Sequence, residues 1–159
     1  MSRAHLFLFV LAVACGGGKS IDTSSDSGDA SPPEYLDLGN TGTACVLPEG
    51  GTWGDWYDTG DSQTLEVDAV VTVLVELDDC YSSSVSGENA SCTVALEDNQ
   101  LVVTSEGGYT LPRGASNNDC NVLAATCTGP ALAEGSYSLS YRGLRVPFTI
   151  PSVGTPCAP

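Results

Sequence analysis

Histidine is almost absent from this sequence of 159 residues. The only one is His5, which lies beside an N-terminal apolar run. A serine or cysteine nucleophile activated by histidine therefore has no base in the rest of the chain. A zinc site with histidine ligands is excluded for the same reason.

Basic side chains are also scarce. The chain has five lysine and arginine residues against twenty aspartate and glutamate residues, a formal net charge of −15 at pH 7. A surface of this sign repels nucleic acid and anionic lipid head groups, so we predict no nucleic-acid partner. It keeps the protein soluble and favours cations or basic partners.

No apolar run is long enough to cross a bilayer as a helix, which takes about 20 residues. The run Leu6–Ala14 follows Arg3 and ends at Cys15, after which the sequence turns to glycine, lysine and serine over residues 16–20. Its length and flanks are typical of a cleaved secretory signal. With the cysteine at its end, the arrangement resembles the export signal of bacterial lipoproteins.

The resemblance implies that residues 1–14 are a lipoprotein signal peptide. Cys15 would then receive a diacylglyceryl group, with palmitate among its acyl chains, and become the mature N-terminus. Two or more acyl chains anchor a protein durably. Gly16 in place of aspartate implies the outer membrane of a bacterial cell envelope. Residues 12–14 also match an ordinary small-x-small cleavage site, which would give a secreted protein instead.

Six cysteines remain without Cys15, an even number that predicts three disulfides in an exported chain. They are Cys45, Cys80, Cys92, Cys120, Cys127 and Cys157. No two are spaced as CxxC, which argues against zinc or redox chemistry. Fifteen pairings are possible. We expect Cys80–Cys92 and Cys120–Cys127 to close short polar loops, and Cys45–Cys157 to join the ends of the domain.

Residues 15–42 are predicted to form a disordered tether that begins at the lipidated cysteine. Glycine, serine, threonine, aspartate and proline dominate here, and such a segment buries too little apolar surface to offset its ordering entropy. As a coil it spans roughly 30 Å. The tether would hold the domain near the membrane without pressing it there.

Apolar residues alternate with polar ones from about residue 43 to the end of the chain, which predicts an all-β domain over residues 43–159. The longest such run, Leu65–Leu77, is too long for one strand and predicts a bend near Asp68. Glu97–Asn99 and Arg142–Gly143 interrupt alternating runs and predict turns. Pro147 cannot donate a ladder hydrogen bond, so its strand is expected at a sheet edge.

The segment Leu132–Tyr137 resembles the tyrosine corner of Greek-key β-sandwiches, in which a tyrosine hydroxyl bonds back to the preceding connection. The resemblance implies an immunoglobulin-like fold. We therefore predict a disulfide-stabilised β-sandwich of about seven or eight short antiparallel strands. A small closed barrel is the alternative.

The Trp53–Asp61 loop is the densest group of chemically active side chains. Asp55, Asp58 and Asp61 offer oxygen ligands for Ca²⁺, although their spacing is not that of an EF-hand. Trp56 and Tyr57 could stack on a sugar. We favour the simpler interpretation, in which aromatic residues of this loop enter the core and the aspartates lie in a solvated turn.

These observations predict an envelope-anchored lipoprotein whose β domain is a non-enzymatic binding or structural module, with a membrane lipid anchor and an unidentified protein or glycan partner. No cofactor is expected. Enzyme activity is disfavoured because histidine is missing and a domain of this size has little room for a cleft between paired carboxylates. The alternative is a calcium- or glycan-binding adhesion module that uses the Trp53–Asp61 loop.

Overall fold

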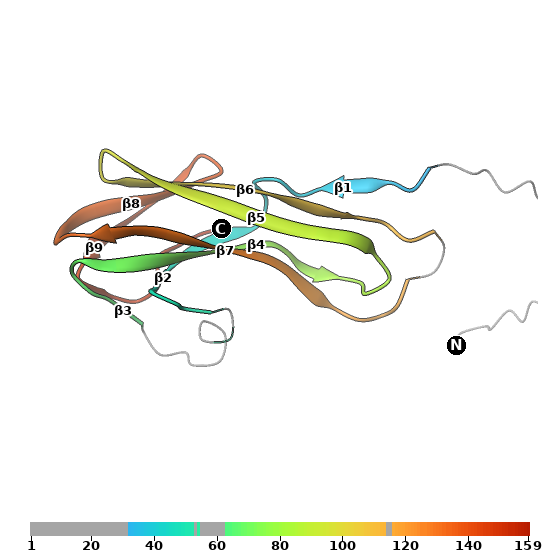
Figure 1. Cartoon of the computed structure of the whole chain (residues 1–159), viewed down its shortest axis with the longest axis horizontal. Coiled ribbons are helices and arrows are strands. Elements are labelled where there is room, and N and C mark those ends of the chain that lie inside the picture. The colour runs from blue at the N-terminus through green and yellow to red at the C-terminus, as the bar shows by residue number, and fades with distance from the viewer. Residues whose placement is uncertain (1–31, 53, 55–62, 114–115) are drawn as a thin grey trace, which may run out of the picture. The chain divides into compact units, whose positions relative to one another are not determined.

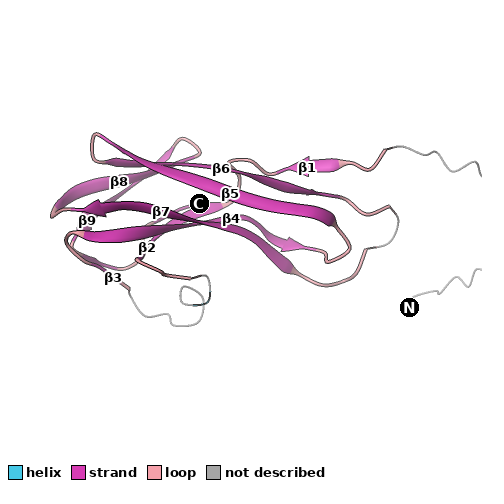
Figure 2. Cartoon of the chain, viewed as in Figure 1, coloured by secondary structure: helices cyan, strands magenta, loops and turns pink. Residues whose placement is uncertain are grey.

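The computed structural model describes residues 32–52, 54, 63–113 and 116–159, and this part is built from β-strands (Figure 2). The strands are β1 (Tyr35–Asp37), β2 (Thr43–Pro48), β3 (Thr64–Leu65), β4 (Ala69–Tyr81), β5 (Ser86–Glu97), β6 (Gln100–Thr110), β7 (Asn121–Leu132), β8 (Gly135–Tyr141), β9 (Leu144–Ile150), β10 (Ser152–Val153) and β11 (Cys157–Ala158).

The strands form two main sheets that lie face to face (Figure 1). In the first sheet, β6 pairs with β5 along one side and with β1 and β8 along the other, and β9 follows β8. The second sheet has the order β11-β2-β4-β7, and β3 and β10 form a separate two-stranded ribbon. The prediction of a disulfide-stabilised all-β sandwich is confirmed.

Two details of that prediction are wrong. The strands are not all short, since β4, β5, β6 and β7 have 11 to 13 residues each. The pairs are not all antiparallel, because β6 and β8 run parallel over three residue pairs. The parallel pair arises because the intervening strand, β7, lies in the opposite sheet, so the chain crosses between the sheets twice before β8 joins β6.

The predicted bend and turns are present. The backbone of Asp68 has φ +59°, which separates β3 from β4 within the alternating run. Asp98 and Asn99 both have positive φ, and so do Arg142 and Gly143. Two consecutive residues with positive φ define the type I′ turn, whose twist matches that of the flanking hairpin strands.

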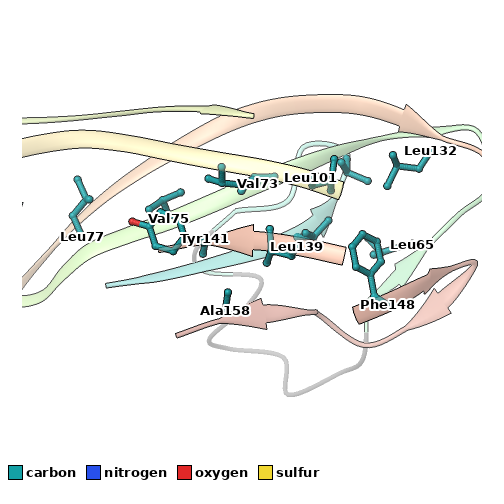
Figure 3. Close-up of a cluster of buried hydrophobic side chains, with 14 of the residues drawn as sticks. Leu65, Val73, Val75, Leu77, Leu101, Leu132, Leu139, Tyr141, Phe148 and Ala158 are labelled. Atoms are coloured by element: carbon teal, nitrogen blue, oxygen red, sulfur yellow. The ribbon is translucent and has the colours of Figure 1, made fainter. Parts of the chain in front are cut away.

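The core lies between the two sheets (Figure 3). Its members are the inward-facing apolar residues of alternating positions, and the labelled ones are Leu65, Val73, Val75, Leu77, Leu101, Leu132, Leu139, Tyr141, Phe148 and Ala158. Burial of a valine or leucine side chain contributes about 1.5–3 kcal/mol before the entropy of ordering is subtracted. This interdigitated layer is therefore the main source of stability.

The disulfides differ from the expected pairing in two of three cases. Cys45–Cys157 is confirmed and joins β2 to β11 with a Cα–Cα distance of 4.1 Å. The other two pairs are Cys80–Cys120 and Cys92–Cys127. Pairing Cys120 with Cys127 is wrong because seven steps of extended chain would separate their Cα atoms by roughly 23 Å.

The expected Cys80–Cys92 pair is wrong for a different reason. Cys80 lies at the end of β4, whereas Cys92 lies six residues into β5, roughly 20 Å further along the sandwich. Cys92 instead faces Cys127 of β7 across the sandwich, with their Cα atoms 5.7 Å apart. This bond joins the two sheets, whereas the Cys80–Cys120 bond links the end of β4 to the start of β7 within one sheet.

Two local predictions hold. The Tyr137 hydroxyl donates a hydrogen bond of 3.0 Å to the carbonyl of Ala133, which is the contact expected of a tyrosine corner. Pro147 lies in β9, which pairs only with β8 within the described residues and so forms a sheet edge. Its missing N–H therefore breaks no ladder.

The folded unit begins earlier than residue 43. It extends over Pro32–Pro159 and includes β1, which pairs with the end of β6. Residues 32–42, predicted as tether, thus belong to the domain. The alternation signal missed them because β1 has only three residues and is followed by a turn at Asn40 and Gly42, both with positive φ.

Candidate functional site

The side chains proposed from the sequence for lipidation and ligand binding lie outside the described residues. They are Cys15, Asp55, Trp56, Tyr57, Asp58 and Asp61. Their roles therefore stay predictions. In the described part of the chain, no three His, Cys, Asp or Glu side chains are grouped in a way that could hold a metal ion.

A hollow of about 490 Å³ opens on the outer face of the β11-β2-β4-β7 sheet. It is lined by Glu49, Gly50, Gly51, Thr52, Val70, Thr72, Leu74, Ala124, Thr126 and Thr128. The register of β4 and β7 places Thr72 opposite Thr128 and Leu74 opposite Thr126. The floor of the hollow is therefore a regular patch of sheet made from threonine and small or apolar side chains.

One wall of the hollow is the chain that leaves β2. The backbone N–H of Gly50 donates a hydrogen bond of 2.9 Å to the Thr72 hydroxyl, which holds the wall to the floor. A Cβ on Gly51 would lie 2.8 Å from the Cβ of Leu47, so only glycine fits there. Thr72 is consequently only 6% exposed although it lies on the outer face of the sheet.

A second hollow of about 260 Å³ shares Glu49 and Val70 with the first. It lies between the end of β2, the ribbon strand β3 and the start of β4. The two hollows are thus contiguous around the Glu49 wall. This places a continuous depression along the first half of β4.

The acidic end of β4 has a structural role. One carboxylate oxygen of Asp78 accepts the backbone N–H of Cys80 at 2.9 Å, and the other accepts the Tyr109 hydroxyl at 2.7 Å. Burial, followed by the bond to Asp78, raises the pKa of Tyr109 to about 12. Since both Asp78 oxygens are engaged, this end of the strand is better explained as strand termination than as a cation site.

Glu76 lies on the same strand, two residues before Asp78. Partial burial, and then the charges of Asp79 and Asp78, raise the pKa of the Glu76 carboxyl. This group therefore opposes folding when it is ionised. Among the described carboxyl groups, Glu76 is the one whose pKa is raised in part by neighbouring negative charges.

The same end of the sheets carries a rigid polar tip built from residues 82–84 and 117–119. Asp119 accepts hydrogen bonds from the Ser83 N–H and the Ser82 hydroxyl, and these bonds lower the pKa of its carboxyl. The Asn117 N–H donates to the Ser84 hydroxyl at 2.8 Å. With the Cys80–Cys120 bond, this network fixes the two loops against each other.

Sequence reasoning missed the hollow because its residues are individually ordinary. The signal was present in two places: the Gly50–Gly51 pair after a strand, and the threonines at alternate positions 126 and 128. Neither identifies a site without the pairing of β4 with β7. The sequence contains no information on that pairing beyond apolar alternation.

No helix in the described part of the chain is both long and apolar enough to span a membrane. Comparison with known proteins gave no further assignment: no protein-family model, no curated protein and no solved structure matches this chain.

Proposed function

We propose that this protein is an envelope-anchored lipoprotein, held by a lipid on Cys15, and that its β domain is a non-enzymatic binding module. The pairing of the cysteines is the observation that supports a lipid anchor on Cys15. Six of the seven cysteines form three disulfides among themselves. Cys15 therefore has no cysteine left to pair with inside the chain, which fits a residue reserved for lipid.

The position of the hollow supports the binding role. The chain enters the domain at β1, where Tyr35 is in register with Thr110, and Thr110 is in register with Ser86. That end also carries the polar tip. Thr72 lies nine residues of extended strand from Tyr81, or roughly 30 Å from the tip. The hollow thus lies well away from the end of the domain that carries β1.

The alternative is a calcium- or glycan-binding adhesion module that uses the Trp53–Asp61 loop to bind its ligand. Thr52, which lines the hollow, immediately precedes that loop in the sequence. A melting temperature that is the same in calcium and in chelator would exclude the calcium form.

The anchor is tested by fractionation of cells that express the full precursor. We expect the wild-type protein in the membrane fraction, released by detergent, and the Cys15→Ala variant in the soluble fraction. The Cys45→Ala/Cys157→Ala variant is the matched control, because it loses a cysteine pair and keeps the anchor. Equal membrane retention of the wild type and Cys15→Ala would overturn the proposal.

A further inference from the structure

The hollow on the outer face of the second sheet has two hydroxyl groups available to a ligand. Thr126 and Thr128 are exposed, and neither side chain makes a hydrogen bond to any described residue. Each hydroxyl can donate one hydrogen bond and accept two. Two other threonines line the hollow: Thr72 already accepts the Gly50 N–H and so belongs to the frame of the site, and Thr52 also has a partner of its own.

Three further side chains that line the hollow are apolar. Leu74 is 3% exposed, and Val70 and Ala124 lie beside it on the hollow's surface. A flat sheet face of this kind offers van der Waals contact to C–H groups. A ligand that fills the hollow must therefore present hydroxyls on one side and C–H groups on another.

The negative charge around the hollow restricts the class of ligand that can bind there. Glu49 is the only ionisable side chain among the described residues that line the hollow, and the whole chain carries −15. Phosphorylated or carboxylated ligands would be repelled by both. Among the described residues, no aromatic or second acidic side chain lines the hollow to select a quaternary or metal cation.

We propose that this hollow binds a neutral saccharide, with the C–H face of a sugar ring on Leu74 and its hydroxyls bonded to Thr126, Thr128 and Glu49. The volume of about 490 Å³ lies within the 300–1,000 Å³ typical of small-molecule sites. The inference rests on the proposed binding function and names the ligand class for it. It assigns the ligand to the threonine face and needs no contribution from the Trp53–Asp61 loop.

The test is ligand binding by the mature chain, made soluble by Cys15→Ala. The probes are the neutral disaccharides chitobiose, cellobiose and maltose at about 10 mM, a range suited to weak ligands, observed by saturation-transfer NMR. We expect at least one to bind. Thr126→Val/Thr128→Val should weaken its binding about tenfold or more, because valine keeps the shape and removes two hydrogen bonds.

Thr149→Val, on the exposed side of β9 in the other sheet, is the matched control and should bind as the wild type does. A sugar phosphate should not bind; equal binding of it would overturn the charge argument. Failure of all three disaccharides would overturn the inference. Binding that survives in a folded Thr126→Val/Thr128→Val variant would exclude this site, while leaving the anchored binding module in place.

Discussion

At the scale of single residues, the most constrained group is a buried hydroxyl network between the sheets. The Tyr141 hydroxyl lies 2.8 Å from that of Ser105 and donates to the carbonyl of Thr41. Ser105 also receives the Asn40 N–H at 3.1 Å, and its own N–H donates to the Asn40 side chain at 2.9 Å. Asn40 thereby provides hydrogen-bond partners for the part of β6 that pairs with neither β1 nor β8.

Replacing Tyr141 by phenylalanine tests this network. Tyr141 and Ser105 are each 1% exposed, so the lost bonds are not replaced by water. We expect Tyr141→Phe to lower the free energy of unfolding by about 1–3 kcal/mol in urea titration. Tyr35→Phe is the control, since that hydroxyl is exposed and its bond to Asn89 is 3.3 Å long; it should change stability by less than about 0.5 kcal/mol. Equal effects would contradict the account.

Glu76 gives a prediction with a defined pH dependence. Its pKa is raised in the folded state, so between the unfolded and the folded pKa values the native protein binds more of this proton than the unfolded chain does. Stability from this group is therefore present below the unfolded pKa of about 4.5 and falls as the pH rises above it.

Glu76→Gln should raise the melting temperature at pH 7 and leave it nearly unchanged at pH 4. Thermal unfolding of both proteins at the two pH values is the measurement. Glu88→Gln, an exposed carboxylate on β5, controls for the general benefit of removing one negative charge. If the two variants gain equally at pH 7, the local crowding argument is wrong.

At the scale of elements, the connection from β1 to β2 shows how closely the sheets approach. Gly42 lies in it with φ +69°, and a Cβ there would be 1.8 Å from the carbonyl oxygen of Glu76. Arg142 donates a hydrogen bond of 2.9 Å to the Gly42 carbonyl. The connection thus docks on β4 in a way that any side chain at residue 42 would prevent.

Gly42→Ala should lower the free energy of unfolding by about 3 kcal/mol or more, since backbone strain adds to a steric clash. Gly143→Ala is the matched control: its φ is +78°, but no atom lies within 4 Å of the added Cβ. We expect it to cost only about 1–2 kcal/mol. Chemical denaturation compares them, and similar losses would show that the docking of residue 42 is unimportant.

The sequence patterns predicted where strands occur better than they predicted which strands pair with each other. Alternation identified the β4 run, and the interruptions of alternation at Glu97–Asn99 and Arg142–Gly143 identified both turns, because those signals are local. The Cys80–Cys120 and Cys92–Cys127 bonds were missed because they depend on which sheet each strand joins. β1 was missed because three residues carry too little periodicity, and the Thr126–Thr128 face could not be recognised without the register of β7 on β4.

At the scale of the whole molecule, uncompensated negative charge dominates the surface. The chain carries −15, and no ion pair forms among the side chains of the described ranges. Repulsion of this kind opposes the compact state. Disulfides offset it, because they restrict the unfolded chain and stabilise a domain typically by 2–4 kcal/mol each.

Salt should therefore stabilise the protein. Raising NaCl from about 0.01 M to about 1 M shortens the screening length from about 30 Å to about 3 Å. We expect the melting temperature at pH 7 to rise by several degrees. Near pH 4, close to the sequence pI of about 4.1, the rise should largely vanish. A melting temperature that falls with salt at pH 7 would contradict this.

The anchored, disulfide-held module is tested most directly by the intact mass of the mature protein extracted from membranes without reduction. The account predicts a chain that begins at Cys15, carries the mass of a diacylglyceryl group lost in Cys15→Ala, and has six cysteines that alkylate only after reduction. A chain of unmodified mass, or one in which any of the six cysteines alkylates without reduction, would contradict it.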